Sequence, residues 1–503
     1  MFGVTKNKAK DFKILFIYPN TMMATLVPMS ISILYPCLKS NGFQVELFDT
    51  TYYKTEEISF EEKKVELLQV KEFHWEEKGV TFKETDIYED LVRKVKTYKP
   101  NLIAVTVVED VFSLTVSLLN AIEQFDIPVV AGGVFATLAP DEVIGEKNID
   151  MMCIGEGEEA LVELCNKMYA GEDYSKIKNL WVKKNGKIIK NPIRPPVDLN
   201  KLPYLDYDIF EEKRILRPMY GKIYKMLHVE IDRGCPYNCT YCEAPQLKGV
   251  YKKCGHNYYR KKSVERVGAE LEHLAKKYRP DYVNFNSETF LARTVEELEE
   301  FAEMYKKFDL PFWCQTRPET VTEEKIRILE EMNCKNLQFG IECGNEEFRA
   351  KILNRYSSNK QMIEAFKTVE KYGIGYTVNN IIGFPDETRE LIFETININR
   401  QINPTTINCY IFTPYKGTYL YQYCLEKGYL NKDAKVHQLL DGAPLKMDSI
   451  TYAELKGLQR TFPLYAKMPE SEFDRIRIAE RFDEEGNKMF QELRKEYYEK
   501  YFK

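Results

Sequence analysis

Short, mostly uncharged runs rich in β-branched and aromatic residues alternate with amphipathic helical segments along this chain, and they form two series. The runs of the first series lie at 13–17, 43–48, 102–108, 128–131 and 151–154. The runs of the second series lie at 226–231, 282–286, 311–315, 336–341, 376–382 and 406–411. Strands that alternate with helices predict parallel sheets, and the scarcity of charge indicates burial on both faces. The sequence therefore predicts an α/β protein, with a doubly wound parallel sheet followed by a partial (β/α)6 barrel.

A proline-rich stretch at 181–221 separates the two series and predicts a linker, with a small hairpin around Asn185-Gly186. The charged, weakly periodic residues 52–88 indicate an insertion, and residues 475–500 predict one amphipathic helix. The expected organisation is a sheet domain at 11–180, a linker at 181–221, a barrel at 222–420 and a small helical C-terminal region at 421–503.

Charge and hydropathy exclude some classes of partner. The 503 residues carry a formal net charge of −5, so the chain has no overall basic field for nucleic acid. A basic, tyrosine-containing stretch at 252–262 is consistent with a nucleic-acid patch or with a solvated loop that enters a helix, and we expect the loop. No apolar run is long enough to span a membrane, and the N-terminus lacks an apolar signal core. We therefore expect no membrane span and a cytoplasmic location.

Three of the twelve cysteines lie together, as Cys235-x3-Cys239-x2-Cys242, directly after the first run of the second series. A loop at the C-terminal mouth of a parallel barrel is where active sites are built. Three thiolates on one loop can hold three irons of a [4Fe–4S] cluster and leave the fourth iron open. Structural zinc needs a fourth nearby ligand, for which Cys254 and His256 are the candidates, and a ferredoxin normally supplies four cysteines. An open [4Fe–4S] cluster is the expected site.

This loop, with the aromatic Tyr241 just before the last cysteine, resembles that of the radical S-adenosylmethionine (SAM) superfamily. The resemblance implies that the open iron binds SAM and that electron transfer yields a 5′-deoxyadenosyl radical. It also implies cofactor contacts at three later strand ends, through Glu288, Arg317 and Glu342. The segment Gly383-Phe-Pro-Asp-Glu resembles the turn that flanks the adenosine in this family, and it is also a good strand-to-helix connection on its own.

Glycines and threonines gather where three strands of the first series end. The candidate ligand residues there are Thr106, Gly132, Gly133, Thr137, Gly155 and Glu156. Open α/β sheets bind ligands at the carboxyl ends of their strands, and glycines let a ligand approach the backbone. The segments around Gly132-Gly133 and Gly155-Glu156 resemble the Rossmann-like cobalamin-binding domain that is fused to many radical SAM enzymes. The resemblance implies cobalamin as a third cofactor.

Histidine usage bears on how cobalamin would be held. The five histidines are His74, His228, His256, His273 and His437. The single histidine of the sheet domain, His74, lies in the insertion and lacks the Asp-x-His-x-x-Gly pattern of His-ligated cobalamin domains. We therefore expect a cobalt without a histidine ligand, covered on its lower face by the loop from Asn20 to Met29.

The combined resemblance implies a cobalamin-dependent C-methyltransferase that acts on an unactivated carbon of a small-molecule or biosynthetic-intermediate substrate. An external electron donor such as flavodoxin or ferredoxin is the implied partner. A cyclase or rearrangement enzyme with the same two domains remains an alternative, as does a non-catalytic electron-transfer or cobalamin-carrier protein. The widely spaced Cys37, Cys153 and Cys165 do not form the additional cysteine cluster of the tRNA methylthiotransferases.

Overall fold

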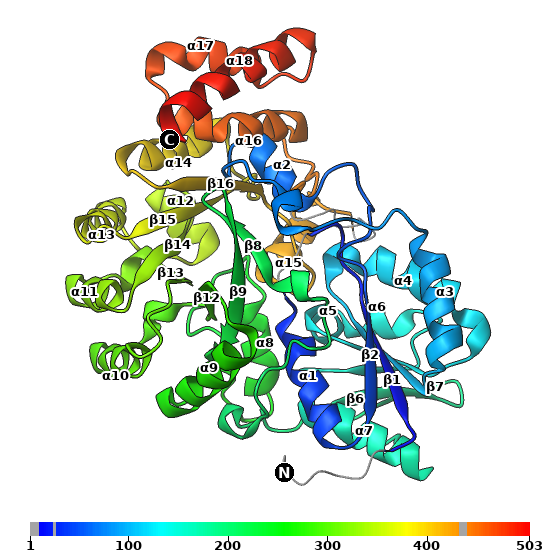
Figure 1. Ribbon diagram of the computed structural model, residues 1–503. Coiled ribbons are helices and arrows are strands. Elements are labelled where there is room, and N and C mark those ends of the chain that lie inside the picture. The colour runs from blue at the N-terminus through cyan, green and yellow to red at the C-terminus, as the bar shows by residue number, and fades with distance from the viewer. Residues whose placement is uncertain (1–9, 24–26, 432–439, 503) are drawn as a thin grey trace.

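The computed structural model describes residues 10–23, 27–431 and 440–502, and it contains the two predicted α/β units side by side (Figure 1). The first unit is a sheet in the order β2-β1-β3-β4-β5-β6-β7, of which the first five strands are parallel. Its strands are β1 Lys13–Tyr18, β2 Gln44–Asp49, β3 Leu102–Thr106, β4 Val129–Gly132, β5 Met151–Cys153, β6 Leu180–Lys184 and β7 Lys187–Lys190. Its helices are α1 Met29–Ser40, α2 Phe60–Glu66, α3 Ile87–Tyr98, α4 Phe112–Ala121, α5 Val134–Leu138, α6 Pro140–Gly145 and α7 Glu158–Ala170.

The second unit is a curled sheet in the order β16-β15-β14-β13-β12-β9-β8, with helices on its outer face (Figure 1). Its strands are β8 Leu216–Met219, β9 Lys222–Glu230, β12 Tyr282–Asn286, β13 Phe312–Thr316, β14 Cys334–Glu342, β15 Gly375–Ile382 and β16 Thr406–Ile411. A short pair, β10 Asp232–Arg233 and β11 Arg260–Lys261, follows β9. The helices are α8 Ala244–Lys252, α9 Val264–Tyr278, α10 Val295–Tyr305, α11 Glu323–Glu331, α12 Glu346–Leu353, α13 Asn359–Lys371, α14 Arg389–Gln401 and α15 Tyr419–Glu426. Six parallel strands confirm the predicted half-barrel, and antiparallel β8 extends its first edge.

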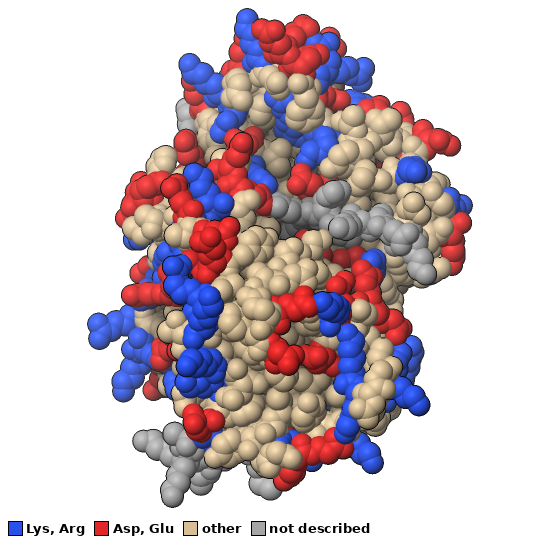
Figure 2. All heavy atoms as spheres, turned by 90° about the vertical axis from the view of Figure 1, so that its right-hand side faces the viewer, with Lys and Arg blue, Asp and Glu red and all other residues tan. Residues whose placement is uncertain are grey.

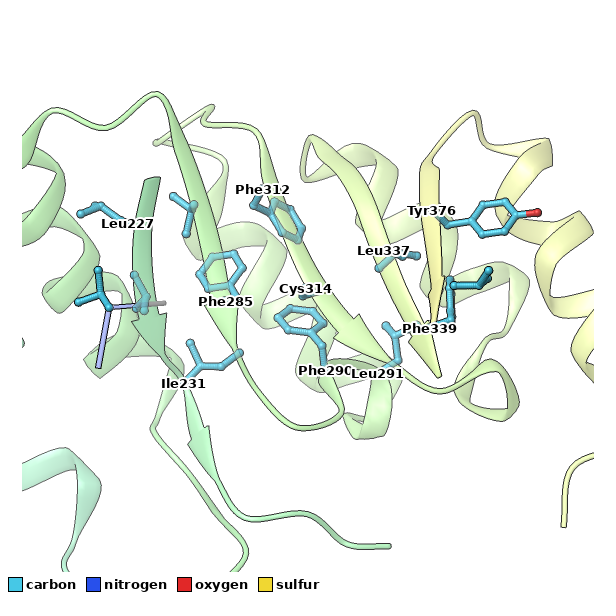
Figure 3. Packing of buried hydrophobic residues seen from close by; sticks show 14 of the residues in the cluster. Leu227, Ile231, Phe285, Phe290, Leu291, Phe312, Cys314, Leu337, Phe339 and Tyr376 are labelled. Carbon is cyan, nitrogen blue, oxygen red and sulfur yellow. The ribbon is translucent and has the colours of Figure 1, made fainter. Parts of the chain in front are cut away.

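The barrel sheet buries its outer face in an aromatic core. The Phe285 ring meets the Phe312 ring edge-on at 5.1 Å between centroids, and Phe290 and Cys314 lie beside them (Figure 3). Side chains alternate across a strand, so the residues between these positions face the inside of the barrel. The outward side chains of the strands are thus apolar and pack against the helices, whereas the inward side chains do not belong to this core and can be polar.

Two segments differ from the sequence-based expectation. The hairpin around Asn185-Gly186 is present, but it pairs with β5 and so extends the first sheet into the range expected to be linker. The single helix expected at 475–500 is wrong. Two helices, α17 Phe473–Ala479 and α18 Glu484–Tyr501, replace it, because the Asp483 carboxylate accepts a hydrogen bond from the Gly486 amide and starts a new helix. With α16 Tyr452–Lys467 they form the helical C-terminal region, at the top of Figure 1.

The insertion from the first unit covers the open side of the half-barrel, between its edge strands β8 and β16. Figure 1 shows α2 beside both strands and α16. The Gln69 side-chain amide donates to the Cys409 carbonyl of β16, and Trp75 packs in one buried cluster with Ile223 of β9. The chain therefore closes the barrel with a segment of the sheet domain. Within the described residues, no helix is long and apolar enough to cross a bilayer.

Candidate active site

The three clustered cysteines lie on the loop between β10 and α8, at the carboxyl end of the barrel strands. All three are half-buried. Burial raises the pKa of Cys242 to about 12, and the charges of Glu288, Cys239 and Cys235 add to the rise. The three thiols are therefore near enough for their charges to interact, although within the described residues they are not drawn together into a closed metal site. Three thiols on one side with no fourth cysteine on the loop fit a [4Fe–4S] cluster that keeps one iron open.

Arg317, at the end of β13, reaches the cysteine loop. Its Nη1 donates to the Cys239 sulfur at 3.2 Å, and its guanidinium lies 3.8 Å from the centre of the Tyr237 ring. Glu319 binds the other side of the guanidinium and orients it. The structure thus brings Arg317 into direct contact with the cysteine loop.

Glu288 follows β12 and lies against the same loop. Its side chain is exposed, makes no hydrogen bond or ion pair among the described residues, and is close enough to raise the pKa of Cys242. The neighbouring Thr289 hydroxyl lies 3.7 Å from the Cys235 sulfur. A free carboxylate beside the cysteine loop is available to a cationic ligand group.

Glu342, at the end of β14, is held in an uncommon backbone conformation. A bulge between β14 and β15 falls at this residue, whose φ of 65° is rare for a non-glycine residue. Its carboxylate folds back over Gly340, where a Cβ would lie 2.0 Å from Oε1, so a side chain at residue 340 would displace this carboxylate. Arg355 binds Glu342 at 3.1 Å and the Tyr241 hydroxyl at 3.3 Å. One buried arginine thus ties the Glu342 strand end to the cysteine loop.

The turn after β15 is held in shape by hydrogen bonds to Glu387, which follows it in the chain. The Glu387 carboxylate accepts hydrogen bonds from the amides of Gly383 and Phe384, at 2.6 and 3.1 Å. The Phe384 ring packs against Tyr241 with centroids 5.8 Å apart. The turn after β15 therefore packs against the cysteine loop through the contact between the Phe384 and Tyr241 rings.

A cavity of about 310 Å³ lies at the carboxyl ends of β1, β3, β4 and β5 in the sheet domain, where the strand order reverses. It is lined mainly by apolar side chains of α1 and the strands. All six candidate residues of this domain line it: Thr106, Gly132, Gly133, Thr137, Gly155 and Glu156. No histidine is among its lining residues in the described part of the chain, and His74 is exposed elsewhere. The size and lining suit an apolar, planar group such as the nucleotide base of cobalamin.

The candidate residues of this domain contribute in different ways. Gly132 leaves open space toward the cavity, whereas a Cβ on Gly133 would lie 2.6 Å from the Val107 carbonyl. The Thr137 hydroxyl accepts from the Gly155 amide and donates to the Gly133 carbonyl, at 3.0 Å each, so it ties two strand-end loops together. The expected covering loop lies partly outside the described residues, but Met29 at its end lines the cavity.

Glu156 links the two domains through buried charges. Arg233, two residues before the first cluster cysteine, binds Glu156 and Glu158 at 2.8 Å each, and Arg260 also binds Glu156. Arg233 reaches Glu230 of the barrel as well. Because Arg233 and Glu156 both line the cavity, this ion cluster forms part of the wall between the cavity and the cysteine loop.

A second contact joins the two domains through the loop after β16. The Lys416 amide donates to Glu109 at 2.8 Å, and the Tyr415 hydroxyl donates to Asp110 at 3.2 Å. Burial raises the pKa of Glu109 to about 7 and that of Asp110 to about 6. The loop after β16 is thereby held against the residues that follow Thr106.

Sequence reasoning did not find the residues that connect these parts. Arg233, Tyr251 and Arg355 each bridge segments far apart in sequence, and none belongs to a recognisable motif. Three cations of the basic stretch after Tyr251 form ion pairs with glutamates elsewhere in the chain: Arg260 with Glu156, Lys261 with Glu297 and Lys262 with Glu270. Figure 2 shows acidic and basic side chains interspersed over one face of the molecule.

Two family models match the chain at these two places. Residues 229–398 match the radical SAM superfamily, and residues 64–165 match the B12 binding domain. The first range contains the cysteine loop and the strand ends around it. The second contains most of the strand ends that line the cavity.

The chain also resembles named proteins in sequence over about two thirds of its length. The chain is 28% identical over 348 residues to an uncharacterized methyltransferase of Pyrococcus horikoshii, covering 68% of this chain and 73% of that protein. It is 26% identical over 352 residues to an anaerobic magnesium-protoporphyrin IX monomethyl ester cyclase of Rubrivivax gelatinosus, covering 67% of this chain and 61% of the cyclase.

Two solved structures share the fold. The radical SAM methyltransferase TsrM from Kitasatospora setae superposes with a TM-score of 0.62 at 19% identity, covering 82% of this chain and 75% of TsrM. The cobalamin-dependent radical enzyme OxsB superposes with a TM-score of 0.66 at 14% identity, covering 97% of this chain and 71% of OxsB. Both matches extend over the sheet domain and the barrel together. The chain therefore belongs to the cobalamin-binding radical SAM enzymes, whose cofactors are a [4Fe–4S] cluster, SAM and cobalamin.

Proposed function

We propose that this enzyme is a methyltransferase that uses both cofactor sites to methylate an unactivated carbon. The observation that carries the proposal is the direct connection between them: Arg233 lines the cavity of the sheet domain and lies two residues from Cys235. A methyl carrier and a radical source must face one substrate, and this wall lies between the two places where they would be held.

The residues are assigned as follows. Cys235, Cys239 and Cys242 bind the cluster, and Tyr241, Glu288, Arg317 and Glu342 contact SAM. Thr106, Gly132, Gly133, Thr137, Gly155 and Glu156 contact the cobalamin. When bound, the cluster and SAM supply a radical that removes hydrogen from the substrate, and the cobalamin supplies the methyl group.

The side chains themselves bind and orient. The free Glu288 carboxylate suits the ammonium group of SAM. Arg317 donates to the Cys239 sulfur, and a hydrogen bond to a cluster sulfur favours the reduced cluster. Burial raises the pKa of Glu342, and the charge of Arg355 opposes that rise while its guanidinium holds the carboxylate in place. These three groups hold one site rigidly at the ends of separate strands.

We further propose a small-molecule or biosynthetic-intermediate substrate and a low-potential electron donor such as flavodoxin or ferredoxin. An iron–sulfur enzyme with an open iron and such a donor fits the reducing cytoplasm. The domain division at 11–180, 181–221, 222–420 and 421–503 serves as a working description, with the β6–β7 hairpin counted with the sheet.

The test is anaerobic reconstitution of the full chain with iron, sulfide and hydroxocobalamin. We expect an iron–sulfur absorption that changes on addition of SAM, together with a bound corrin. Cys239→Ala should abolish 5′-deoxyadenosine formation and keep the corrin, whereas Cys254→Ala, at an exposed cysteine outside the cluster, serves as the matched control. Loss of SAM cleavage in both variants, or in neither, would contradict the assignment.

Methyl-labelled SAM then tests methyl transfer. We expect labelled product with S-adenosylhomocysteine and 5′-deoxyadenosine formed together. Formation of 5′-deoxyadenosine without labelled product would instead support cyclisation or rearrangement, the alternative favoured by the similarity to the ester cyclase. A cluster spectrum unchanged by SAM would support the non-catalytic carrier.

A further inference from the structure

The inner face of the barrel sheet carries a polar side chain on each of its six parallel strands, although Met226, Trp313 and Ile381 also lie on this face. Its inward positions alternate with the apolar outer residues on the same strands. They carry His228, Asn284, Gln315, Gln338, Asn379, Asn408 and Tyr410. Neighbouring strands are tied by amide hydrogen bonds, from Gln338 to Asn379 at 3.2 Å and from Asn408 to Asn379 at 2.8 Å. Such a face suits a polar molecule, because the Asn408 Oδ1 atom still lacks a partner among the described residues.

Three side chains of the inner face are less buried than the outer core of the same strands. Gln315, Gln338 and Tyr410 are half-buried, although the sheet curls around them and the insertion covers its open side. The outer residues of the same strands, such as Phe312 and Phe339, are fully buried. The inner face is therefore packed less completely than the outer core.

Arg217, on the edge strand β8, is a buried cation with two unpartnered nitrogen atoms among the described residues. It lies opposite Tyr224 of β9, so both side chains are on one face of the sheet. Its side chain is 4% exposed, and its Nε and Nη1 atoms find no hydrogen-bond partner among the described residues. Burial, with the nearby charge of Arg214, lowers the pKa of Arg217 to about 10, which leaves it charged at neutral pH. A buried charge is costly unless an opposite charge meets it.

His228, on β9, offers a second unused donor. Asn284 lies 2.9 Å from its Nδ1, and the amide donates to that atom, so the proton is on Nε2. This Nε2 is buried and has no partner among the described residues. Burial, then the charges of Arg217 and Arg214, holds the pKa of His228 well below its usual value, so the ring is neutral.

The neighbouring charges do not neutralise Arg217. Asp49 binds Arg214 at 3.1 Å, and Glu61 of the insertion binds Lys64 at 3.5 Å. The charge of Glu61 also acts on Arg217, where it opposes the fall in pKa, but it makes no ion pair with Arg217 within the described part of the chain. The three cations Arg214, Arg217 and Lys64 thus have two carboxylates, Asp49 and Glu61, between them, and one positive charge is left over. Among the described residues, this cluster lacks one anion.

We propose that the inner face of the barrel binds an anionic group of the methyl acceptor, a carboxylate or a phosphate, between Arg217 and His228. This inference rests on the proposed function, since it concerns the substrate of that reaction. The amide-lined face then holds the rest of a polar substrate, with the anion at the β8 edge and the remainder directed along the strands toward the cysteine loop.

The experiment measures thermal unfolding of the reconstituted full chain in acetate, malonate and inorganic phosphate, with ethylammonium chloride as the cationic control. Wild type is compared with Arg217→Met, Arg217→Lys and Arg279→Met. The last variant makes the same change at an exposed arginine that ends α9. It corrects for the general stabilisation of proteins by salts.

We expect Arg217→Met to unfold a few degrees above wild type without anion, because the unpaired buried charge is gone. Anions should raise the unfolding temperature of wild type and of Arg279→Met. They should raise that of Arg217→Met only by the general salt effect. Arg217→Lys should retain part of the anion-specific rise. A larger specific shift with acetate and malonate indicates a carboxylate, and one with phosphate indicates a phosphate. Equal shifts in all variants, or an Arg217→Met protein that unfolds below wild type or does not fold, would overturn the inference. Formation of 5′-deoxyadenosine by wild type is followed in parallel, so its absence would remove the proposed function and leave the anion result standing.

Discussion

The hydroxyl of Tyr251 accepts a hydrogen bond of 2.8 Å from the backbone amide of Glu156, and it joins the helix after the cysteine loop to a strand end of the other domain. The contact is possible because residue 155 is glycine: a Cβ there would lie 2.4 Å from the same hydroxyl. The glycine was predicted from the sequence as an approach point for a ligand. It serves equally as the place where the two domains touch.

Gly155→Ala should therefore lower the free energy of unfolding by more than the backbone strain alone. Gly155 and Gly171 both have positive φ, of 75° and 69°, but Gly171 has nothing within 4 Å of a Cβ. We expect a loss of about 1 kcal/mol for Gly171→Ala and of ~2–4 kcal/mol for Gly155→Ala, measured by denaturant unfolding. Introducing Tyr251→Phe should recover part of the second loss, because it removes the clashing oxygen. Equal losses at the two glycines would show that Tyr251 does not constrain residue 155.

Arg233→Met should be among the most destabilising single changes at the domain contact. It leaves Glu156, Glu158 and Glu230 without their shared cation in a buried place. Removing one partner of a buried ion cluster costs about 3–5 kcal/mol. Arg194→Met, which breaks pairs with two half-exposed glutamates, should cost less than about 1 kcal/mol and serves as the control in urea unfolding. A small effect at Arg233 would mean that the domains are held mainly by other contacts.

Gly132→Val should reduce cobalamin binding without unfolding the sheet domain. A Cβ at Gly132 has its nearest neighbour, the Cβ of Cys153, at 3.9 Å, so the added methyl groups extend into the cavity. We expect corrin affinity to fall at least about tenfold, ~1.4 kcal/mol, in a titration followed by visible absorbance. Gly133→Ala, where the Cβ would lie 2.6 Å from the Val107 carbonyl, should instead lower the unfolding temperature. Unchanged corrin affinity in Gly132→Val would place the cofactor outside this cavity.

Glu387 should make the protein less stable in alkaline solution. Burial raises its pKa from an ordinary value of 4.5 to about 8, against two backbone hydrogen bonds that lower it. The folded state thus holds this proton more tightly than the unfolded state, so the stabilisation is complete below about pH 4.5 and is lost as the pH rises through about 8. Glu387→Gln removes the titration, and its unfolding free energy should fall less than that of wild type between pH 5 and about 9. Glu364→Gln, at an exposed carboxylate, should follow the wild-type curve.

The strands and most helices could be predicted from the sequence because their period is local. The runs at 282–286 and 406–411 coincide with β12 and β16, since alternating burial and flanking turns are recorded in neighbouring residues. The break at Asp483 was missed because a capping aspartate inside a charged periodic stretch looks like part of its solvated face. The periodicity of a sequence shows which face of a helix is apolar. It does not show where a helix begins, because that depends on a single capping hydrogen bond.

The candidate site was predictable in its motifs and not in its connections. The cysteine loop and the strand-end glycines follow from spacing, and both reappear at strand ends in the structure. Arg355, which binds Glu342 and Tyr241, could not be found, because its partners lie 13 and 114 residues away in sequence. Arg217 was missed for a related reason: its significance is the lack of a partner, which only the folded chain reveals.

The segment that carries α2 has a consequence for how this protein can be rearranged. It belongs to the amino-terminal half of the chain, yet Gln69 and Trp75 complete the wall of the carboxyl-terminal half. A cut in the proline-rich linker would therefore yield a barrel with an open flank and an amino-terminal half with an exposed aromatic cluster. The two halves are therefore not interchangeable modules. Another cobalamin domain could replace this one only if it also supplied a segment that closes the open side of the barrel.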